Sequence, residues 1–160
     1  MYKKDSRRWW NQFWDRSYVV INPDSAQAQS SSWQVGRNYQ LFRYQLGCNA
    51  YGKLPTKFNG GLFTYDPSLV NRSFPFTSDH RDWGGGTHTA QNQRLVYWPM
   101  LKSGDFDMMY PQLDFYLNAL ENARLRVQQY WGHRGACFTE QIEWFGLPMA
   151  GSDGGNRPCF

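Results

Sequence analysis

A glycine run near the middle of the chain leads into polar side chains that suit the binding of an oxygen-rich ligand. The stretch 83–92 reads Trp-Gly-Gly-Gly-Thr-His-Thr-Ala-Gln-Asn. It places His88 and Asn92 four residues apart, on one face of a predicted helix start that also carries Thr89. Helix N-termini favour anions and oxygen-rich ligands because their backbone N–H groups are unpaired. The alternative is a capped helix in which His88 makes only a local hydrogen bond.

A second cluster carries carboxylates. The stretch 132–143 contains Arg134 and places Glu140 and Glu143 three residues apart. Hydrolysis of a glycosidic bond commonly uses two carboxyl groups, about 5 Å apart for retention and about 6.5–9.5 Å apart for inversion. Two carboxylates on one helical turn project the same way, so we expect one of them, rather than both, to bind a hydroxyl or to take part in catalysis. A solvated carboxylate pair is the alternative.

Aromatic side chains supply the third feature. The chain holds 8 Trp, 10 Tyr and 11 Phe, or 18% aromatic residues. Such rings build cores, and they also form flat walls against which the apolar faces of sugars pack. Trp83 is the candidate wall beside the glycine run, and Asn59 is a polar amide on a glycine turn within a long loop at 52–86.

Composition excludes several classes of protein. Seventeen basic and thirteen acidic residues give a net charge of +4 without a long basic run, which argues against a dedicated nucleic-acid binder. No apolar run is long enough to span a membrane. The three cysteines are odd in number and far apart, and neither a disulfide framework nor a metal site is expected. No phosphate loop or dinucleotide fingerprint is present, so no cofactor is expected.

Apolar periodicity predicts an all-α protein with long aromatic loops. We expect a short helix around Trp10, Phe13 and Trp14. Longer helices are predicted over 32–48, from Thr87 or Thr89 to 101, and over 105–131 with a kink or a restart at Pro111. A turn or two of helix is predicted over 139–145. The apolar stripes that support the two clearest helices are Val35, Tyr39, Phe42 and Leu46 in one and Met109, Leu113, Tyr116, Leu120, Ala123, Val127 and Tyr130 in the other.

The domain organisation follows from these elements. Residues 1–31 are expected to form a lead-in, 32–148 a region of helical hairpins, and 149–160 an end without a closing element. Three or four helices do not obviously close a core, so we expect part of a larger catalytic domain.

Taken together, the three polar segments resemble glycoside hydrolase family 95 and its relatives among the six-hairpin glycosidases. That family has a Leu-Pro-x-Asn-Leu-Gln-Gly-x-Trp loop, and residues 54–60 read Leu-Pro-Thr-Lys-Phe-Asn-Gly. Its Trp-Gly-Ser-Asp-Tyr-His-Thr-Asn-Ile-Asn stretch is followed by Tyr-Trp, and residues 83–98 match it without a gap. Its Gly-x-Arg-Gly and His-His-x-Thr-Asp-x-Trp-Gly motifs are similar to residues 132–146.

The resemblance implies a partial (α/α)6 toroid and roles for single residues. His88 matches a sugar-contacting histidine, and Asn92 matches one of two asparagines that hold the attacking water. Ala90 stands where the family has the second asparagine, and Thr139-Glu140 replaces the His-His pair. The implied site has Asn92 and Glu140 in catalysis, with the substrate contacted by His88, Trp83, Asn59, Thr89, Arg134 and Glu143. The resemblance places the family's acid and base further along than residue 160, so part of the catalytic machinery is expected outside this sequence.

The function expected from the resemblance is that of an exo-acting, inverting glycosidase that removes a fucose- or galactose-like terminal sugar. The alternatives are a carbohydrate-binding protein without catalysis, or a lyase or phosphorylase on the same toroid. The expected partner is a carbohydrate, with no nucleic acid and no membrane, and kinship implies a periplasmic or extracellular bacterial location. All of this requires that the glycine run and the stretch from Arg134 to Glu143 converge in space.

Overall fold

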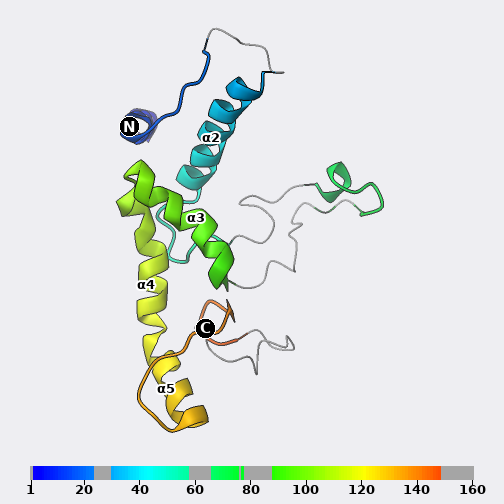
Figure 1. Ribbon diagram of the computed structural model, residues 1–160. Helices are drawn as coiled ribbons and strands as arrows, with labels where there is room; N and C mark the ends of the chain where they lie inside the picture. Colours follow the sequence, from blue (N-terminus) through cyan, green and yellow to red (C-terminus); the bar gives the residue numbers. More distant parts are fainter. Residues whose placement is uncertain (1, 24–29, 58–65, 76, 78–87, 149–160) are drawn as a thin grey trace.

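The computed structural model describes residues 2–23, 30–57, 66–75, 77 and 88–148, and helices dominate them (Figure 1). The elements in chain order are α1 (Tyr2–Arg16), α2 (Ser31–Cys48), the 3₁₀ turn η1 (Pro67–Leu69), β1 (His88–Thr89), α3 (Ala90–Ser103), the 3₁₀ turn η3 (Phe106–Met109), α4 (Tyr110–Asn118), α5 (Leu120–Trp131) and β2 (Gln141–Ile142).

The expected helical character is confirmed. Helix α2 lies within one residue of the predicted range, and α3 begins directly after Thr89. Ser30, the residue before α2, makes no capping bond to the helix backbone, and its hydroxyl lies 3.0 Å from that of Ser32 instead. None of the helices in the described ranges has the length and apolar character that spanning a bilayer requires.

The core lies where α1, α2, α3 and η3 meet. Its buried members are Phe13, Leu46, Val96, Tyr97, Met100 and Met108. The aromatic face predicted for the first helix is confirmed, because Phe13 is buried and Trp10 and Trp14 pack against this cluster. The rings of Trp10 and Phe13 meet edge to face with centroids 5.5 Å apart, an arrangement that aromatic quadrupoles favour.

The region 105–131 is broken into three pieces rather than forming one helix. Pro111 lies in the first turn of α4, where its missing N–H costs nothing, so the predicted restart is the alternative that the structure adopts. The axis breaks again at Ala119, between α4 and α5. Helix α5 ends as predicted at Gly132, which takes the left-handed conformation with φ 66°.

These breaks shift the buried face, so the predicted stripe is wrong in part. Ala123 and Val127 are buried as expected, but Leu113 and Tyr130 are 49% and 66% exposed. Besides Asp105, the buried positions in this region are Met108, Pro111, Phe115, Ala119, Ala123 and Val127. Apolar spacing along a single uninterrupted helix could not anticipate the change of phase that the η3 turn and the break at Ala119 introduce.

The short helix predicted over 139–145 is also wrong, because this segment is extended. Strand β2 pairs antiparallel with β1 and forms a further bridge between Ile142 and Pro148. Ile142 is only 1% exposed, and a β-branched side chain suits such a position. The hydroxyl of Thr139 donates to the carbonyl of Gln141 at 2.8 Å instead of capping a helix.

The cysteines differ from expectation in one respect. Cys137, which is buried beside α5, is disulfide-bonded, whereas Cys48 is free. Cys159 lies outside the described residues.

Two glycines allow the packing of the extended segment on α5 to be tested. Both Gly132 and Gly146 have positive φ, but a Cβ added at Gly146 would lie 2.9 Å from the Cβ of Ala119, whereas one at Gly132 would meet nothing within 4 Å. We predict that Gly132→Ala lowers the free energy of unfolding by about 1–2 kcal/mol. Gly146→Ala should cost roughly 1–3 kcal/mol more because it adds a steric clash. Urea denaturation of both variants measures the difference, and equal midpoints would refute this packing.

Candidate functional site

The two segments that the sequence analysis joined do meet in space. His88 pairs with Ile142 and Thr89 pairs with Gln141 across the β1–β2 ladder. The N–H of Ala90, the first residue of α3, donates to the carbonyl of Glu140 at 2.9 Å. The start of α3 therefore lies against the segment that carries both candidate carboxylates, and this backbone pairing defines the candidate site.

Asn92 lies in the first turn of α3, half-buried, at the edge of a hollow of about 740 Å³. The hollow runs along the outer face of the helix to Trp98, Pro99 and Lys102. Trp98 is 59% exposed, and the guanidinium carbon of Arg94 lies 5.4 Å from the centre of its ring. This face therefore offers an amide, an open ring and cations within three turns of one helix.

Arg134 is exposed and lies elsewhere. It lines a separate hollow of about 740 Å³ at the end of α5, together with Gln128 and His133. Asn92 and Arg134 thus belong to two different surface hollows.

Glu140 and Glu143 flank β2, and each is half-buried. The N–H of Glu143 donates to the carbonyl of Leu147 at 2.8 Å, and its carbonyl accepts from the N–H of Gly146 at 2.9 Å. Because this segment is extended and then turns, the two carboxylates do not share one helical turn. The geometric basis for treating them as a pair is therefore lost, and the proximity of Glu140 to the start of α3 distinguishes it from Glu143.

The other predicted site residues are described only in part. Asn59 and Trp83 lie outside the described residues. For His88 and Thr89 the structure describes the backbone pairing alone.

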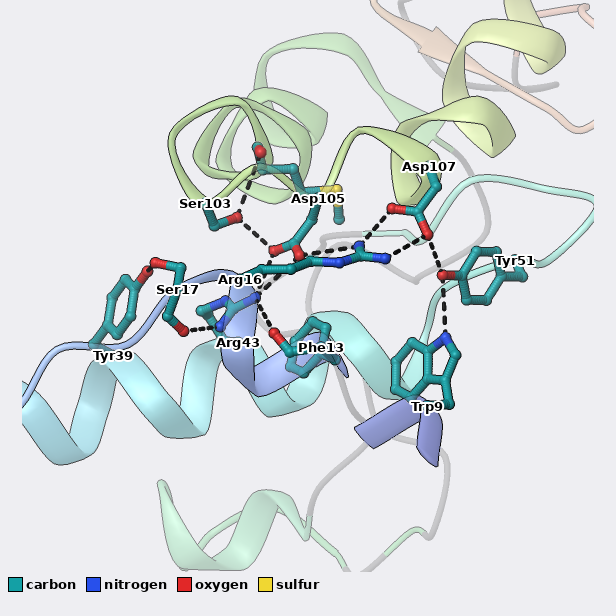
Figure 2. A network of polar contacts seen from close by, with 11 residues as sticks. Trp9, Phe13, Arg16, Ser17, Tyr39, Arg43, Tyr51, Ser103, Asp105 and Asp107 are labelled. Atoms are coloured by element: carbon teal, nitrogen blue, oxygen red, sulfur yellow. Dashed lines mark hydrogen bonds and ion pairs between the residues drawn. The ribbon is translucent and has the colours of Figure 1, made fainter. Parts of the chain in front are cut away.

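The most extensive polar cluster in the described part of the chain was missed by the sequence analysis (Figure 2). At its centre a single guanidinium nitrogen of Arg43 donates to both carboxylate oxygens of Asp105, at 2.9 and 3.0 Å. Arg43 is 2% exposed and Asp105 is fully buried. The hydroxyl of Ser103 also donates to Asp105.

Arg43 connects this ion pair to the end of α1. Its guanidinium donates to the carbonyls of Phe13, at 3.1 Å, and of Ser17. The guanidinium carbon also lies 4.1 Å from the centre of the Phe13 ring, a cation–π distance. A buried arginine is costly unless its donors are paired, and here the carboxylate and the two carbonyls pair both terminal nitrogens of Arg43, while its buried Nε–H has no partner among the described residues.

A more exposed half of the same cluster extends toward solvent. Arg16 donates to Asp107 at 2.6 and 3.1 Å and to Asp105 at 3.3 Å. Tyr51 donates to Asp107 and accepts from the indole N–H of Trp9 at 3.2 Å. Figure 2 shows these side chains arriving from α1, from the segment after α2 and from η3.

The electrostatics follow from these contacts. The hydrogen bond to Asp107, with the neighbouring carboxylate charges, outweighs burial and raises the pKa of Arg16. Partial burial acts to raise the pKa of Asp107, but the hydrogen bonds from Arg16 and Tyr51 outweigh it and hold that pKa below its ordinary value. Burial and the hydrogen bond to Asp107 raise the pKa of Tyr51. All three groups therefore stay in one charge state near neutral pH, which suits a structural role.

Among the residues that the structure describes, no three His, Cys, Asp or Glu side chains are grouped so that they could hold a metal ion. Comparison of the chain with protein-family models, with curated proteins and with solved structures gives no match.

The lowered pKa of Asp107 gives the cluster a signature in acid. A carboxyl group whose pKa is lower in the folded state stabilises the fold above its unfolded pKa, and that contribution is lost as the pH falls through the folded pKa. We therefore predict that the urea midpoint falls as the pH drops below about 4. Asp107→Asn should make this fall shallower, whereas Asp114→Asn, on an exposed position of α4, should leave it unchanged. Identical pH profiles for all three proteins would contradict the assignment.

Proposed function

We propose that the chain forms part of a glycoside hydrolase that removes a terminal, fucose- or galactose-like sugar with inversion. One observation supports this proposal above the others. The β1–β2 pairing brings the start of α3 and the segment around Glu140 together, as a single sugar site formed by these two segments would require. The similarity of both segments to motifs of the six-hairpin glycosidases supplies the chemistry, and the helical architecture is compatible with a piece of their toroid.

In this proposal Asn92 and Glu140 have different tasks. The amide of Asn92 both donates and accepts hydrogen bonds, so it can hold a water molecule in a fixed orientation. The carboxyl group of Glu140 acts as an acid or a base, or binds a sugar hydroxyl. Positioning by His88, Thr89 and Trp83 would fix the sugar ring, with Asn59 and Glu143 as further contacts to substrate. Arg134, which lines a separate hollow at the end of α5, is not part of this site. No cofactor is needed for this chemistry.

The hydrolase proposal predicts turnover that depends on Glu140. The complete catalytic domain, of which we propose that this chain forms part, should release nitrophenol from 4-nitrophenyl α-L-fucoside or from the corresponding galactosides. Glu140→Gln should lower kcat by about 10²- to 10⁴-fold, the usual contribution of a general acid or base. Asn92→Ala should lower it as well, because the water is no longer held.

Asp114→Asn is the matched control, since it removes one carboxylate charge on the exposed face of α4. It should retain the activity of the parent domain. Absence of turnover on every glycoside, or a rate that Glu140→Gln leaves unchanged, would count against this hydrolase.

A carbohydrate-binding function without catalysis is the second candidate, and the surface of α3 favours it. Trp98 presents an open ring beside Asn92, Arg94 and Lys102 along one hollow. A flat ring next to hydrogen-bonding groups suits a sugar, whose apolar face stacks while its hydroxyls bind the polar neighbours. Ala90, in place of the second asparagine of the family, removes one group that would hold the attacking water.

Binding by this surface can be measured directly. Trp98→Ala should weaken binding of fucose or galactose by roughly three- to tenfold, which corresponds to about 0.5–1.5 kcal/mol. Trp131→Ala, which removes another exposed ring at the end of α5, is the control and should bind like the parent chain. NMR titration with each sugar gives the dissociation constants. Equal losses in the two variants would refute a role for the Trp98 ring.

A further inference from the structure

The first two turns of α1 concentrate positive charge. The helix carries five basic and two acidic side chains, a net +3 out of the +4 of the whole chain. Four of these cations, Lys3, Lys4, Arg7 and Arg8, are exposed. The basic character of the protein is therefore largely a property of this one helix.

The arrangement of these side chains is regular. Lys3, Arg7 and Asn11 follow one another at four-residue spacing, and Lys4, Arg8 and Gln12 form a second, parallel row. Successive members of a row are about 6 Å apart along the axis, since four residues rise about 6 Å. All six side chains line one hollow of about 520 Å³.

The four cations have no acidic partner in the described part of the chain. The ion pairs found there involve Arg16, Arg43 and Arg124. Asp5 and Asp15, the two acidic residues of α1 itself, are exposed and are not in these pairs, and Asp105 and Asp107 are bound by Arg16 and Arg43 at the other end of the helix. The hollow on α1 thus presents positive charge and amides to solvent, and it is suited to an anionic ligand.

The apolar face of α1 excludes two modes of binding. Trp9, Trp10 and Phe13 pack into or against the core. Trp9 and Phe13 lie on the side of the helix opposite the two rows, and Trp10 lies at the margin of the row of Lys3 and Arg7. They are not free to enter a lipid surface. No ring lines the hollow, so it provides no platform on which unpaired bases could stack.

The remaining lining groups favour a hydroxyl-rich anion. Asn11 and Gln12 offer acceptors as well as donors, whereas the phosphate oxygens of nucleic acids only accept. Four cations are also fewer than the six to ten phosphate contacts typical of strong nucleic-acid binding. We propose that the hollow on α1 binds an anionic polysaccharide, a hydroxyl-rich chain that carries sulfate or carboxylate groups. This site is separate from the start of α3 and does not depend on the function proposed there.

The test compares polymers and variants at several salt concentrations. The chain should bind immobilised heparin or polygalacturonate, with an affinity that falls linearly on a log–log plot between about 50 and 200 mM salt, and should not bind neutral dextran. Preference for heparin identifies sulfate as the recognised group, and preference for polygalacturonate identifies carboxylate; either result supports the proposal. Binding to neither polymer overturns it, as does tighter binding to duplex DNA at the same salt concentration.

Charge removal at matched positions locates the site. The double variant R7Q/R8Q should weaken binding by roughly tenfold or more and reduce the salt slope by about one to two. The control K53Q/R72Q removes the same charge from exposed positions outside α1 and should have a much smaller effect. Equal losses in the two double variants would show that only net charge matters and would overturn the α1 site. The hydrolysis assay is read separately, so the two proposals can fail independently.

Discussion

The buried ion pair between Arg43 and Asp105 is the interaction on which the described fold depends. Removing two charges from water is costly, and a lone buried charge is far worse, so each partner is tolerable only while the other is in place. Asp105 lies two residues after the end of α3, and Arg43 lies in the C-terminal third of α2. Because Arg43 also binds carbonyls at the end of α1, one guanidinium fixes the relative positions of three helices.

The Arg43–Asp105 pair also helps to position the candidate site, because it holds the helix that carries Asn92. The ion pair holds the C-terminal end of α3. The middle of this helix packs against the core through Val96, Tyr97 and Met100. The N-terminal end, with Asn92, is tied instead by the two-residue β1–β2 ladder and by the bond from Ala90 to Glu140. In the first turn of α3, Gln93 is also fully buried and its amide donates to the carbonyl of Thr56 at 2.6 Å, so both ends of the helix that carries Asn92 are fixed.

The sequence predicted the bounds of α2 and the start of α3 closely, but it missed the break at Ala119 and predicted a helix where β2 lies. Motif similarity brought the start of α3 and Glu140 to one place. The sequence could not reveal the Arg43–Asp105 pair. Arg43 lies between Tyr39 and Leu46 on the buried side of α2, where apolar residues are expected. A charged residue at such a position was the only indication in the sequence of a buried ion pair. The extended form of 139–145 escaped prediction because it depends on pairing with β1, fifty residues away. Nor could helix periodicity show that Asn92 and Arg134 face different hollows.

The same network accounts for the uneven distribution of charge. Asp105 and Asp107 face inward to Arg16 and Arg43, so the acidic groups near α1 serve the end of that helix which enters the core. Its first two turns are left with cations that the described carboxylates do not neutralise. Asp5 is the one carboxylate within the stretch from Lys3 to Arg8, and it offsets only one of four positive charges. Asp105 cannot be diverted to this stretch, because removing it from Arg43 would leave a buried charge unpaired. Because Asp105 and Asp107 pair with Arg16 and Arg43, they do not neutralise the cations at the outer end of α1, which can bind an external anion.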